Sequence, residues 1–267
     1  MPDISSRSID VNSHNQAAWD HQAKQDCDWS RPVSEAVIAA ARNGQWAVQL
    51  THGALPDDWL GDVCDQRILC LASGGGQQAP VLAAAGAQVT VFDVSRSQLD
   101  QDRLVAAREG LSLVAVQGDM RNLSAFDDAS FDIVFQPIAN HYVDDVRSVW
   151  RECFRVLRPG GRLLAGFYNP VIFVGDRDPD LFAQGLIRPV FSIPYADATD
   201  MDEEALEAKV GRDEALVFGH SLTDLIAGQI QAGFVIAGFQ EDPAPRARFL
   251  IDRYLPTFIS TLAIRPV

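Results

Sequence analysis

Short apolar runs alternate with amphipathic segments through the middle of this chain. The apolar runs predict β-strands at 67–72, 88–92, 111–116, 131–135 and 162–167. Helical spacing between them predicts helices at 77–85, 95–108 and 144–157. Such alternation is typical of a mostly parallel sheet covered by helices on both faces, because parallel strands need crossover connections. We therefore predict a doubly wound α/β fold.

The residues before these strands and helices lack the alternation of apolar runs and amphipathic segments. Residues 1–65 are polar and rich in Trp, and helical spacing is evident only at 34–42. We expect this stretch to form an N-terminal helical cover segment. Its Trp19 and Trp29 are expected either to close over a ligand and exclude water or to pack as ordinary core aromatic residues.

The residues after the fifth predicted strand also break the pattern. Residues 168–219 carry several Pro and Asp and one acidic helical stretch, which predicts an insertion, or lid. Its aromatic side chains either line an apolar pocket or form the insertion's own small core. The pattern then resumes with a helix and two strands, predicted at 222–232, 234–239 and 257–264. We therefore divide the chain into the cover segment and one domain, 66–267, that contains the insertion.

Composition narrows the class of protein. With 267 residues, 47% of them hydrophobic, the chain is long enough for a sizeable core. A formal net charge of -14 argues against a nucleic-acid partner, because such a surface repels phosphate. No long apolar stretch and no signal peptide are visible, so we expect no membrane partner and a cytoplasmic setting. The four cysteines lack a CxxC pair, and no metal site is expected.

The most informative positions follow the predicted strands, because ligands bind open parallel sheets beyond the carboxyl ends of the strands. Gly74, Gly75 and Gly76 follow the first strand, where glycines let the backbone turn sharply and approach a ligand. Alternatively, they form a plain tight turn. The spacing does not fit a dinucleotide fingerprint, because Gln77 replaces its third glycine, and no P-loop lysine follows.

Acidic residues end the next two strands. The carboxylate of Asp93 can accept hydrogen bonds from the two vicinal hydroxyls of a ribose. Its alternative role is to cap the following helix, although Ser95 can do that. Asp119 precedes Met120, and this pairing of a carboxylate with an apolar side chain suits an adenine amino group and ring.

Together these segments resemble the class I S-adenosylmethionine-dependent methyltransferases. The resembling stretch covers about 67–167 and contains ILCLASGGG, VFDVS, GDM, FDIVF and VLRPGG in the family's order. The resemblance implies a mostly parallel seven-stranded sheet whose last strand is antiparallel, with S-adenosylmethionine as cofactor. Two positions depart from the family pattern: Cys70 stands where an acidic residue is common, and Ala72 replaces the first glycine.

The resemblance also implies roles for individual residues. The implied cofactor-binding residues are Ser73, Gly74, Gly75, Gly76, Asp93, Val94, Asp119, Met120 and Pro137. The first four are expected to face the methionine and ribose portions. Asp93 is expected to bind the ribose hydroxyls, and Val94, Asp119 and Met120 are expected to lie beside the adenine. Pro137 is expected to border the methionine portion.

Four further residues are candidates for handling the methyl acceptor. A base is needed only if the nucleophile arrives protonated; otherwise the protein mainly aligns it. His141 and Tyr142, after the fourth strand, are the candidate catalytic residues, since histidine titrates near working pH. Tyr168 and His220 are candidate substrate contacts. A structural role is the alternative for His141, and capping of the next helix is the alternative for His220.

The sequence thus predicts an enzyme that transfers a methyl group from S-adenosylmethionine to a small-molecule acceptor. The acidic charge balance motivates the small acceptor. The alternatives are a methyltransferase acting on RNA or protein, a regulatory domain that binds the cofactor without turnover, and a nicotinamide-dependent reductase. The acceptor atom and the oligomeric state stay open.

Overall fold

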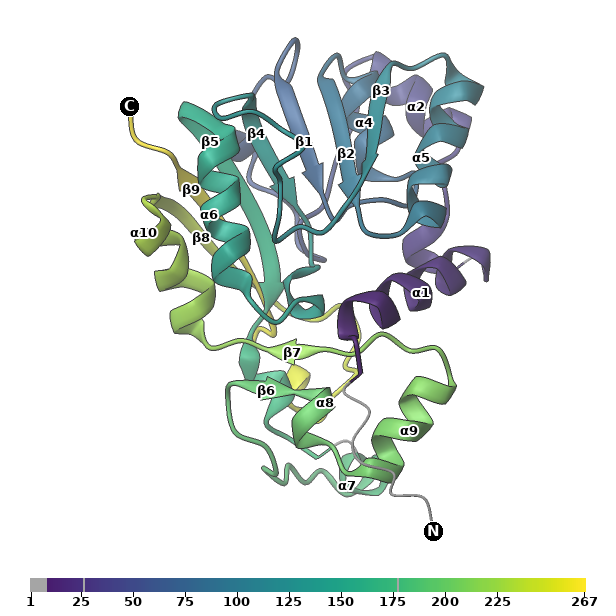
Figure 1. The fold of residues 1–267 in the computed structure, drawn as a ribbon, viewed down its shortest axis with the longest axis vertical. Coiled ribbons are helices and arrows are strands. Elements are labelled where there is room, and N and C mark those ends of the chain that lie inside the picture. Colours follow the sequence, from purple (N-terminus) through teal and green to yellow (C-terminus); the bar gives the residue numbers. More distant parts are fainter. Residues whose placement is uncertain (1–8, 26, 177) are drawn as a thin grey trace.

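A seven-stranded sheet forms the centre of the molecule (Figure 1). The computed structural model describes residues 9–25, 27–176 and 178–267. The strands are β1 (Arg67–Leu71), β2 (Gln88–Asp93), β3 (Leu113–Gln117), β4 (Phe131–Gln136), β5 (Leu157–Tyr168), β8 (Val235–Asp242) and β9 (Phe258–Ile264). Their order is β3-β2-β1-β4-β5-β9-β8. β9 pairs antiparallel with β5 and β8, and the other neighbouring pairs are parallel. The predicted fold class is confirmed.

Helices cover both faces of this sheet (Figure 1). One face is covered by α2 (Glu35–Arg42), α3 (Asp57–Leu60), α4 (Gln78–Ala84) and α5 (Arg96–Glu109), the other by α6 (Val146–Val156) and α10 (Gly228–Ala232). β1 shows why two cores form. Ile68 and Cys70 point into the first core, and Leu69 and Leu71 point into the second. A strand buried on both sides reads as a continuous apolar run, as the sequence predicted.

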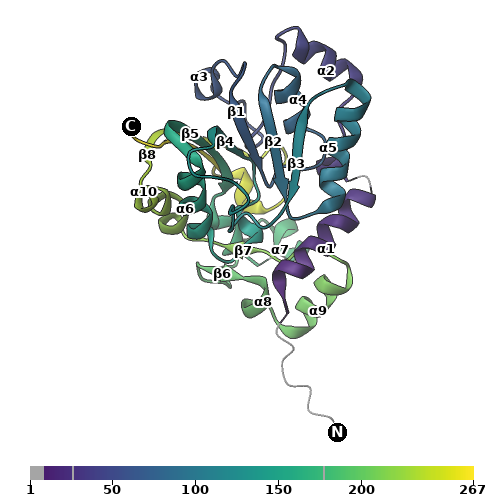
Figure 2. The ribbon, with the colours of Figure 1, turned by 45° about the horizontal axis from the view of Figure 1, so that its top comes forward.

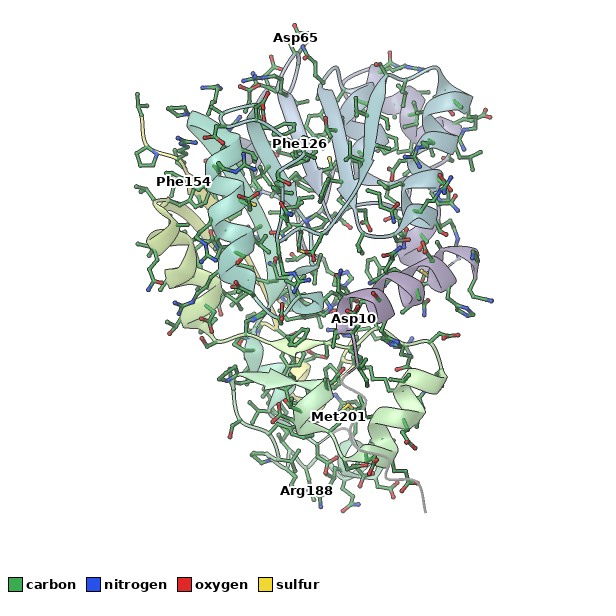
Figure 3. All side chains as sticks on the ribbon, viewed as in Figure 1. Asp10, Asp65, Phe126, Phe154, Arg188 and Met201 are labelled. Carbon is green, nitrogen blue, oxygen red and sulfur yellow. The ribbon has the colours of Figure 1, made fainter. Side chains whose placement is uncertain are left out.

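The insertion forms a separate lobe beyond the carboxyl ends of the parallel strands (Figures 1 and 2). Its regular elements are α7 (Pro179–Gln184), β6 (Tyr195–Ala196), α8 (Asp197–Asp200), α9 (Glu203–Gly211) and β7 (Phe218–Gly219). Figure 3 shows Arg188 and Met201 in this lobe, at the opposite end of the molecule from Asp65, which precedes β1. Phe173 stacks on Tyr195 at 5.9 Å, so these aromatic residues form the lobe's own small core.

A first helix, α1 (Val11–Lys24), lies between the insertion lobe and the sheet (Figure 2). The hydrophobic pattern did not predict it, because its buried positions include only small or polar residues: Asn15, Ala18 and Ala23. Asn15 explains the burial. Its amide donates to the carbonyl oxygens of Tyr142 (3.1 Å) and Leu216 (2.9 Å) and accepts from the Leu216 N–H (2.8 Å). Polar pairing therefore replaces apolar contact in joining α1 to its neighbours.

Two other predicted elements differ from the structure. The stretch 158–161 was expected to separate a helix from the fifth strand, but β5 begins at Leu157 and contains it. Gly160 adopts φ +74° there and its N–H donates to the Arg265 carbonyl, so the strand continues through an irregularity. The helix predicted at 222–232 begins with a wider, π-helical turn at Thr223–Ala227. Among the described residues, no helix is long and apolar enough to cross a membrane.

Candidate active site

A cavity opens at the carboxyl ends of the parallel strands, facing the insertion lobe. Ten of the predicted site residues line it: Ser73, Gly74, Asp93, Val94, Asp119, Met120, Pro137, His141, Tyr142 and Tyr168. Residues from the N-terminal segment also line it: Asn12, Asn15, Trp19, Trp29, Gln49, Leu50, Thr51 and His52. The sheet topology thus brings together side chains that are up to about 150 positions apart in the sequence.

Two carboxylates hold the glycine loop after β1. The Gly74 N–H donates to Asp93 Oδ2 at 3.0 Å. The N–H groups of Gly75 and Gly76 donate to the two oxygens of Asp102 at 3.1 and 3.2 Å. Asp102, on α5, is fully buried. Every backbone N–H of the glycine run therefore has a carboxyl oxygen as partner, which fixes the path of the loop.

The glycines are required by space as well as by conformation. Gly75 has φ +115°, and a Cβ there would lie 2.5 Å from the Trp29 carbonyl oxygen. A Cβ on Gly74 would lie 2.7 Å from Cβ of Gln98. The loop is therefore pressed between the N-terminal segment and α5, and only glycine fits.

Burial shapes the electrostatics of both carboxylates. Burial raises the pKa of Asp93 to about 6, although the N–H groups of Ser95 and Gly74 favour its ionised form. Burial, and then the charge of Asp93, raise the pKa of Asp102 well above its usual range. A raised pKa means that the folded chain binds the carboxyl proton more tightly than the unfolded chain does. For Asp93, the resulting stabilisation of the fold is fully present at low pH and is lost as pH rises through about 6.

The adenine side of the predicted site is built by residues after β3. Asp119 pairs with Arg121, whose Nε donates to Oδ2 at 2.9 Å and whose Nη2 lies 2.5 Å from the same oxygen. Arg121 also pairs with Asp144, which ties the loop to the start of α6. Met120 is buried, and its sulfur accepts from Gln136 Nε2 at 3.3 Å. Asp119 lines the cavity with its position fixed by these contacts.

The N-terminal segment is fastened directly to the glycine loop. Gln77 Nε2 donates to the carbonyl oxygens of Asp28 (2.7 Å) and Arg31 (3.0 Å). Asp20 of α1 accepts from Ser95 Oγ at 2.6 Å and from the Ser97 N–H at 2.9 Å, at the start of α5. These contacts place Trp19 and Trp29 at the cavity; Trp29 is 58% exposed and is not a core residue.

A continuous row of aromatic rings, here called the aromatic wall, lines the cavity. We define it by seven rings that follow one another in contact: Trp29, His52, Phe258, Tyr168, His141, Tyr142 and Trp19. Neighbouring ring centroids are 4.9 to 5.5 Å apart, within the range of favourable aromatic contact, except for His141 and Tyr142, which are closer at 3.9 Å. All of these rings except Phe258 line the cavity.

His141 is buried in the middle of this wall. Its ring lies 3.9 Å from that of Tyr142 and 4.9 Å from that of Tyr168, centroid to centroid. Burial lowers the pKa of His141 to about 3, so its ring is neutral near pH 7. Among the described residues, none hydrogen-bonds its ring nitrogens, which leaves them available to a ligand. Burial raises the pKa of Tyr142, whose hydroxyl stays protonated.

Of the two predicted substrate contacts, the structure places one at the cavity and the other outside it. Tyr168, at the end of β5, lines the cavity. His220 does not; its Nε2 lies 3.1 and 2.9 Å from the carbonyl oxygens of Asn140 and Val143. His220 therefore fastens the loop that carries His141, which differs from both roles weighed for it. Gly75 and Gly76 also stand behind the cavity lining, held by Asp102.

Sequence reasoning missed several cavity residues. The segment containing Leu50, Thr51 and His52 has no periodic pattern, yet it crosses the strand ends: the Leu50 carbonyl accepts from the Ile138 N–H at 3.2 Å. Asp102 had a usable signal. It occupies the same buried helix face as Gln98, and polar residues on such a face need partners nearby.

The site has features that fit an adenosine-containing cofactor. Ser73 Oγ and Gln98 Oε1 are buried and have no hydrogen-bond partner among the residues that the structure describes, and both residues line the cavity. A buried polar atom left unpaired is costly, so these atoms are suited to a polar ligand. A Cβ on Gly74 would lie 3.1 Å from Asp93 Oδ2, so glycine at this position lets the loop backbone approach that carboxylate at the cavity.

The fold and site define a class of protein, the Rossmann-like methyltransferases, and comparison with known proteins agrees. The methyltransferase domain family matches residues 69–165. Uncharacterized methyltransferase YbaJ of Bacillus subtilis is 44% identical over 254 residues, which cover 95% of this chain and 98% of that protein. Demethylmenaquinone methyltransferase of Clavibacter sepedonicus is 29% identical over 167 residues, covering 62% of this chain and 65% of that protein.

A solved structure shares the fold. The S-adenosylmethionine-dependent methyltransferase from Mesorhizobium loti matches with a TM-score of 0.61 and 21% identity, over 78% of this chain and 94% of that chain. This chain belongs to the class I S-adenosylmethionine-dependent methyltransferase family.

The backbone conformation of Ala72 leads to a prediction about the stability of the chain. It adopts φ +47°, a left-handed conformation that costs about 1–2 kcal/mol for a residue with a Cβ. We expect Ala72→Gly to change the free energy of unfolding by less than about 1 kcal/mol, because the greater freedom of glycine in the unfolded chain offsets the relieved strain. Ala72→Val is expected to lose about 1–3 kcal/mol, since branched residues tolerate this region worst. Urea unfolding measures both, and a valine variant as stable as the parent contradicts this account.

Proposed function

We propose that this methyltransferase binds S-adenosylmethionine on the glycine-loop side of the cavity and methylates a small, flat, largely apolar molecule held against the aromatic wall. The observation that carries the proposal is the juxtaposition of these two surfaces in one cavity. Aromatic side chains provide apolar area with a preferred ring-on-ring geometry, which suits an aromatic or conjugated acceptor.

The residues proposed to hold the cofactor are those that line the cavity beside β1, β2 and β3. Asp93 accepts from the ribose hydroxyls, and Val94 and Met120 flank the adenine. Asp119 has lone pairs beyond those used by Arg121 and can accept from the adenine amino group. When bound, S-adenosylmethionine supplies a methyl group on a positively charged sulfur, an electrophile suited to in-line displacement.

The chain's own contribution is alignment, exclusion of water and proton handling. Trp19, Trp29 and α1 cover the cavity, which limits access of water. We propose that the neutral ring of His141 accepts a hydrogen bond from the acceptor's nucleophilic group and that Tyr142 orients it. With a pKa of about 3 in the free protein, His141 is a weak base. It therefore suits an acceptor that is itself acidic, such as a phenol, thiol or enol.

Three observations support a small acceptor over RNA or protein. The net charge is -14, and the cavity is bounded by α1, the 49–52 segment and the aromatic wall. The relatives that act on demethylmenaquinone and in ubiquinone biosynthesis bear names that point to small ring compounds.

A cofactor-binding domain without turnover is the second candidate function. The departures from the family's sequence pattern at Cys70 and Ala72 favour it.

Calorimetry tests the cofactor directly. We expect S-adenosylmethionine and S-adenosylhomocysteine to bind with one site per chain, and NADH to give no heat. Asp93→Ala is expected to weaken both ligands by about 1–3 kcal/mol, because it removes hydrogen bonds to a charged acceptor. Binding of NADH alone contradicts the proposal.

The same titration has an expected pH dependence. Hydroxyl donors favour the ionised carboxylate, so ligand binding lowers the pKa of Asp93 from about 6 in the free protein. Affinity should therefore be level above about pH 7 and fall by up to about tenfold per pH unit below pH 6. Asp93→Asn is the matched control, because it removes the titrating group at nearly constant size. Its affinity should not vary over this range.

The catalytic residues are tested once an acceptor is found by screening metabolite extracts with methyl-labelled cofactor. His141→Asn is expected to lower kcat by about 10²-fold or more, because proton handling contributes about that much. Tyr142→Phe should lower kcat less, and both variants should keep the cofactor affinity of the parent. Turnover equal to that of the parent in either variant removes that residue from the mechanism.

A further inference from the structure

One arginine stands at the rim of the aromatic wall. The guanidinium carbon of Arg248 lies 5.0 Å from the ring centroid of Tyr168 and 5.2 Å from that of Phe258. Its Nη1 donates to the Tyr168 hydroxyl at 3.0 Å. Because Tyr168 lines the cavity, Arg248 brings a positive charge to the edge of the proposed acceptor site.

The backbone around this arginine is firmly held. The N–H groups of Arg248 and Phe249 both donate to Asp252 Oδ2 at 2.8 Å. The other oxygen of Asp252 accepts from Thr257 Oγ1 at 2.6 Å, and Asp252 is only 8% exposed. A buried carboxylate therefore connects the arginine's loop to the residue just before β9.

The guanidinium itself has spare hydrogen-bonding capacity. In the part of the chain that the structure describes, no carboxylate lies within ion-pair distance of Arg248. Arg147 and Arg155, by contrast, pair with Asp224 and Glu152. A guanidinium carries five N–H donors, and the contact with Tyr168 uses one. In a chain of net charge -14, an arginine left unpaired at a cavity rim is available to an external anion.

The charge of Arg248 also reaches the cavity. After burial, it is the next cause of the lowered pKa of His52, and it adds to the lowering that burial produces at His141. Both histidines line the cavity, on different segments of the chain. The arginine therefore acts electrostatically on the inside of the site and not only on the outer surface.

We propose that Arg248 is a specificity residue that binds an oxyanion, a carboxylate or a phosphate, on the methyl acceptor while the acceptor's ring lies against the aromatic wall. This inference rests on the proposed function and narrows its substrate class to acidic ring compounds. The guanidinium presents a planar pair of donors that matches such an anion, and the Tyr168 hydroxyl beside it can donate as well. The anion lies at the rim, so the rest of the ring is directed toward His141.

The test uses small probes on the full chain saturated with S-adenosylhomocysteine. The probes are 4-hydroxybenzoate, phenyl phosphate and 4-hydroxybenzamide, which is a neutral counterpart of the first. Calorimetry or tryptophan fluorescence measures each dissociation constant. At least one anion is expected to bind about tenfold or more tighter than the amide. Tighter binding of 4-hydroxybenzoate indicates that the acceptor carries a carboxylate, and tighter binding of phenyl phosphate indicates that it carries a phosphate.

Variants assign the preference to Arg248. Arg248→Met keeps an unbranched apolar stem and removes the charge, so it is expected to reduce the preference to less than about threefold, whereas Arg248→Lys retains part of it. Arg246→Met removes a neighbouring exposed charge and should leave the preference unchanged. Equal binding of all three probes to the parent chain overturns the proposal, as does an undiminished preference in Arg248→Met.

The outcome is separable from that of the proposed function. Binding of S-adenosylhomocysteine is measured first, in the parent and in each variant. If it fails, the cofactor assignment is wrong, and the probe titrations repeated on the free protein still report on Arg248. If it succeeds and the anions show no preference, only the assignment of Arg248 is wrong.

Discussion

The site depends on one set of hydrogen bonds, those from the glycine-loop N–H groups to Asp93 and Asp102. Three consecutive donors meet the buried carboxyl group of Asp102 and the carboxyl group of Asp93 at the cavity, which holds the loop against the end of β2 and against α5. The Gly75 N–H also donates to the Gln98 carbonyl, whereas losing the carboxyl partners of Gly74 and Gly76 is expected to cost about 1–3 kcal/mol each. Asp93 serves the loop with one oxygen and still borders the cavity. The same contacts therefore stabilise the fold and position the carboxylate that we propose binds the ribose of the cofactor.

The opposite side of the cavity is assembled from segments outside the parallel strands. Asn15 joins α1 to Tyr142 and to the chain just before β7, and Gln77 joins the glycine loop to the segment before α2. These polar contacts keep the cover and the insertion lobe in one arrangement with the sheet. The aromatic wall then completes a site whose proposed acceptor side is mainly apolar and whose proposed cofactor side is polar.

Much of the fold was predictable because the parallel strands are buried on both faces. Ile68 to Leu71 read as a continuous apolar run, and Asp93 stands at the end of the next strand, where such sheets bind ligands. The features that the sequence did not predict correctly share a cause. Asn15 holds α1 against its neighbours by hydrogen bonds, and backbone N–H groups donate to the buried Asp102. Neither contact leaves an apolar pattern in the sequence. β5 runs through Pro159 and Gly160, where the Gly160 N–H donates to the Arg265 carbonyl and the Arg265 N–H donates to the Gly161 carbonyl. Tertiary hydrogen bonds decided these elements, and local periodicity does not encode them.

The most direct test of this account is a crystal structure of the chain with S-adenosylhomocysteine. The account predicts the ribose hydroxyls within about 3 Å of the Asp93 carboxylate, with the adenine between Val94 and Met120 and the glycine loop unmoved. Density for the ligand elsewhere, or a cradle filled by the protein's own side chains, would contradict it.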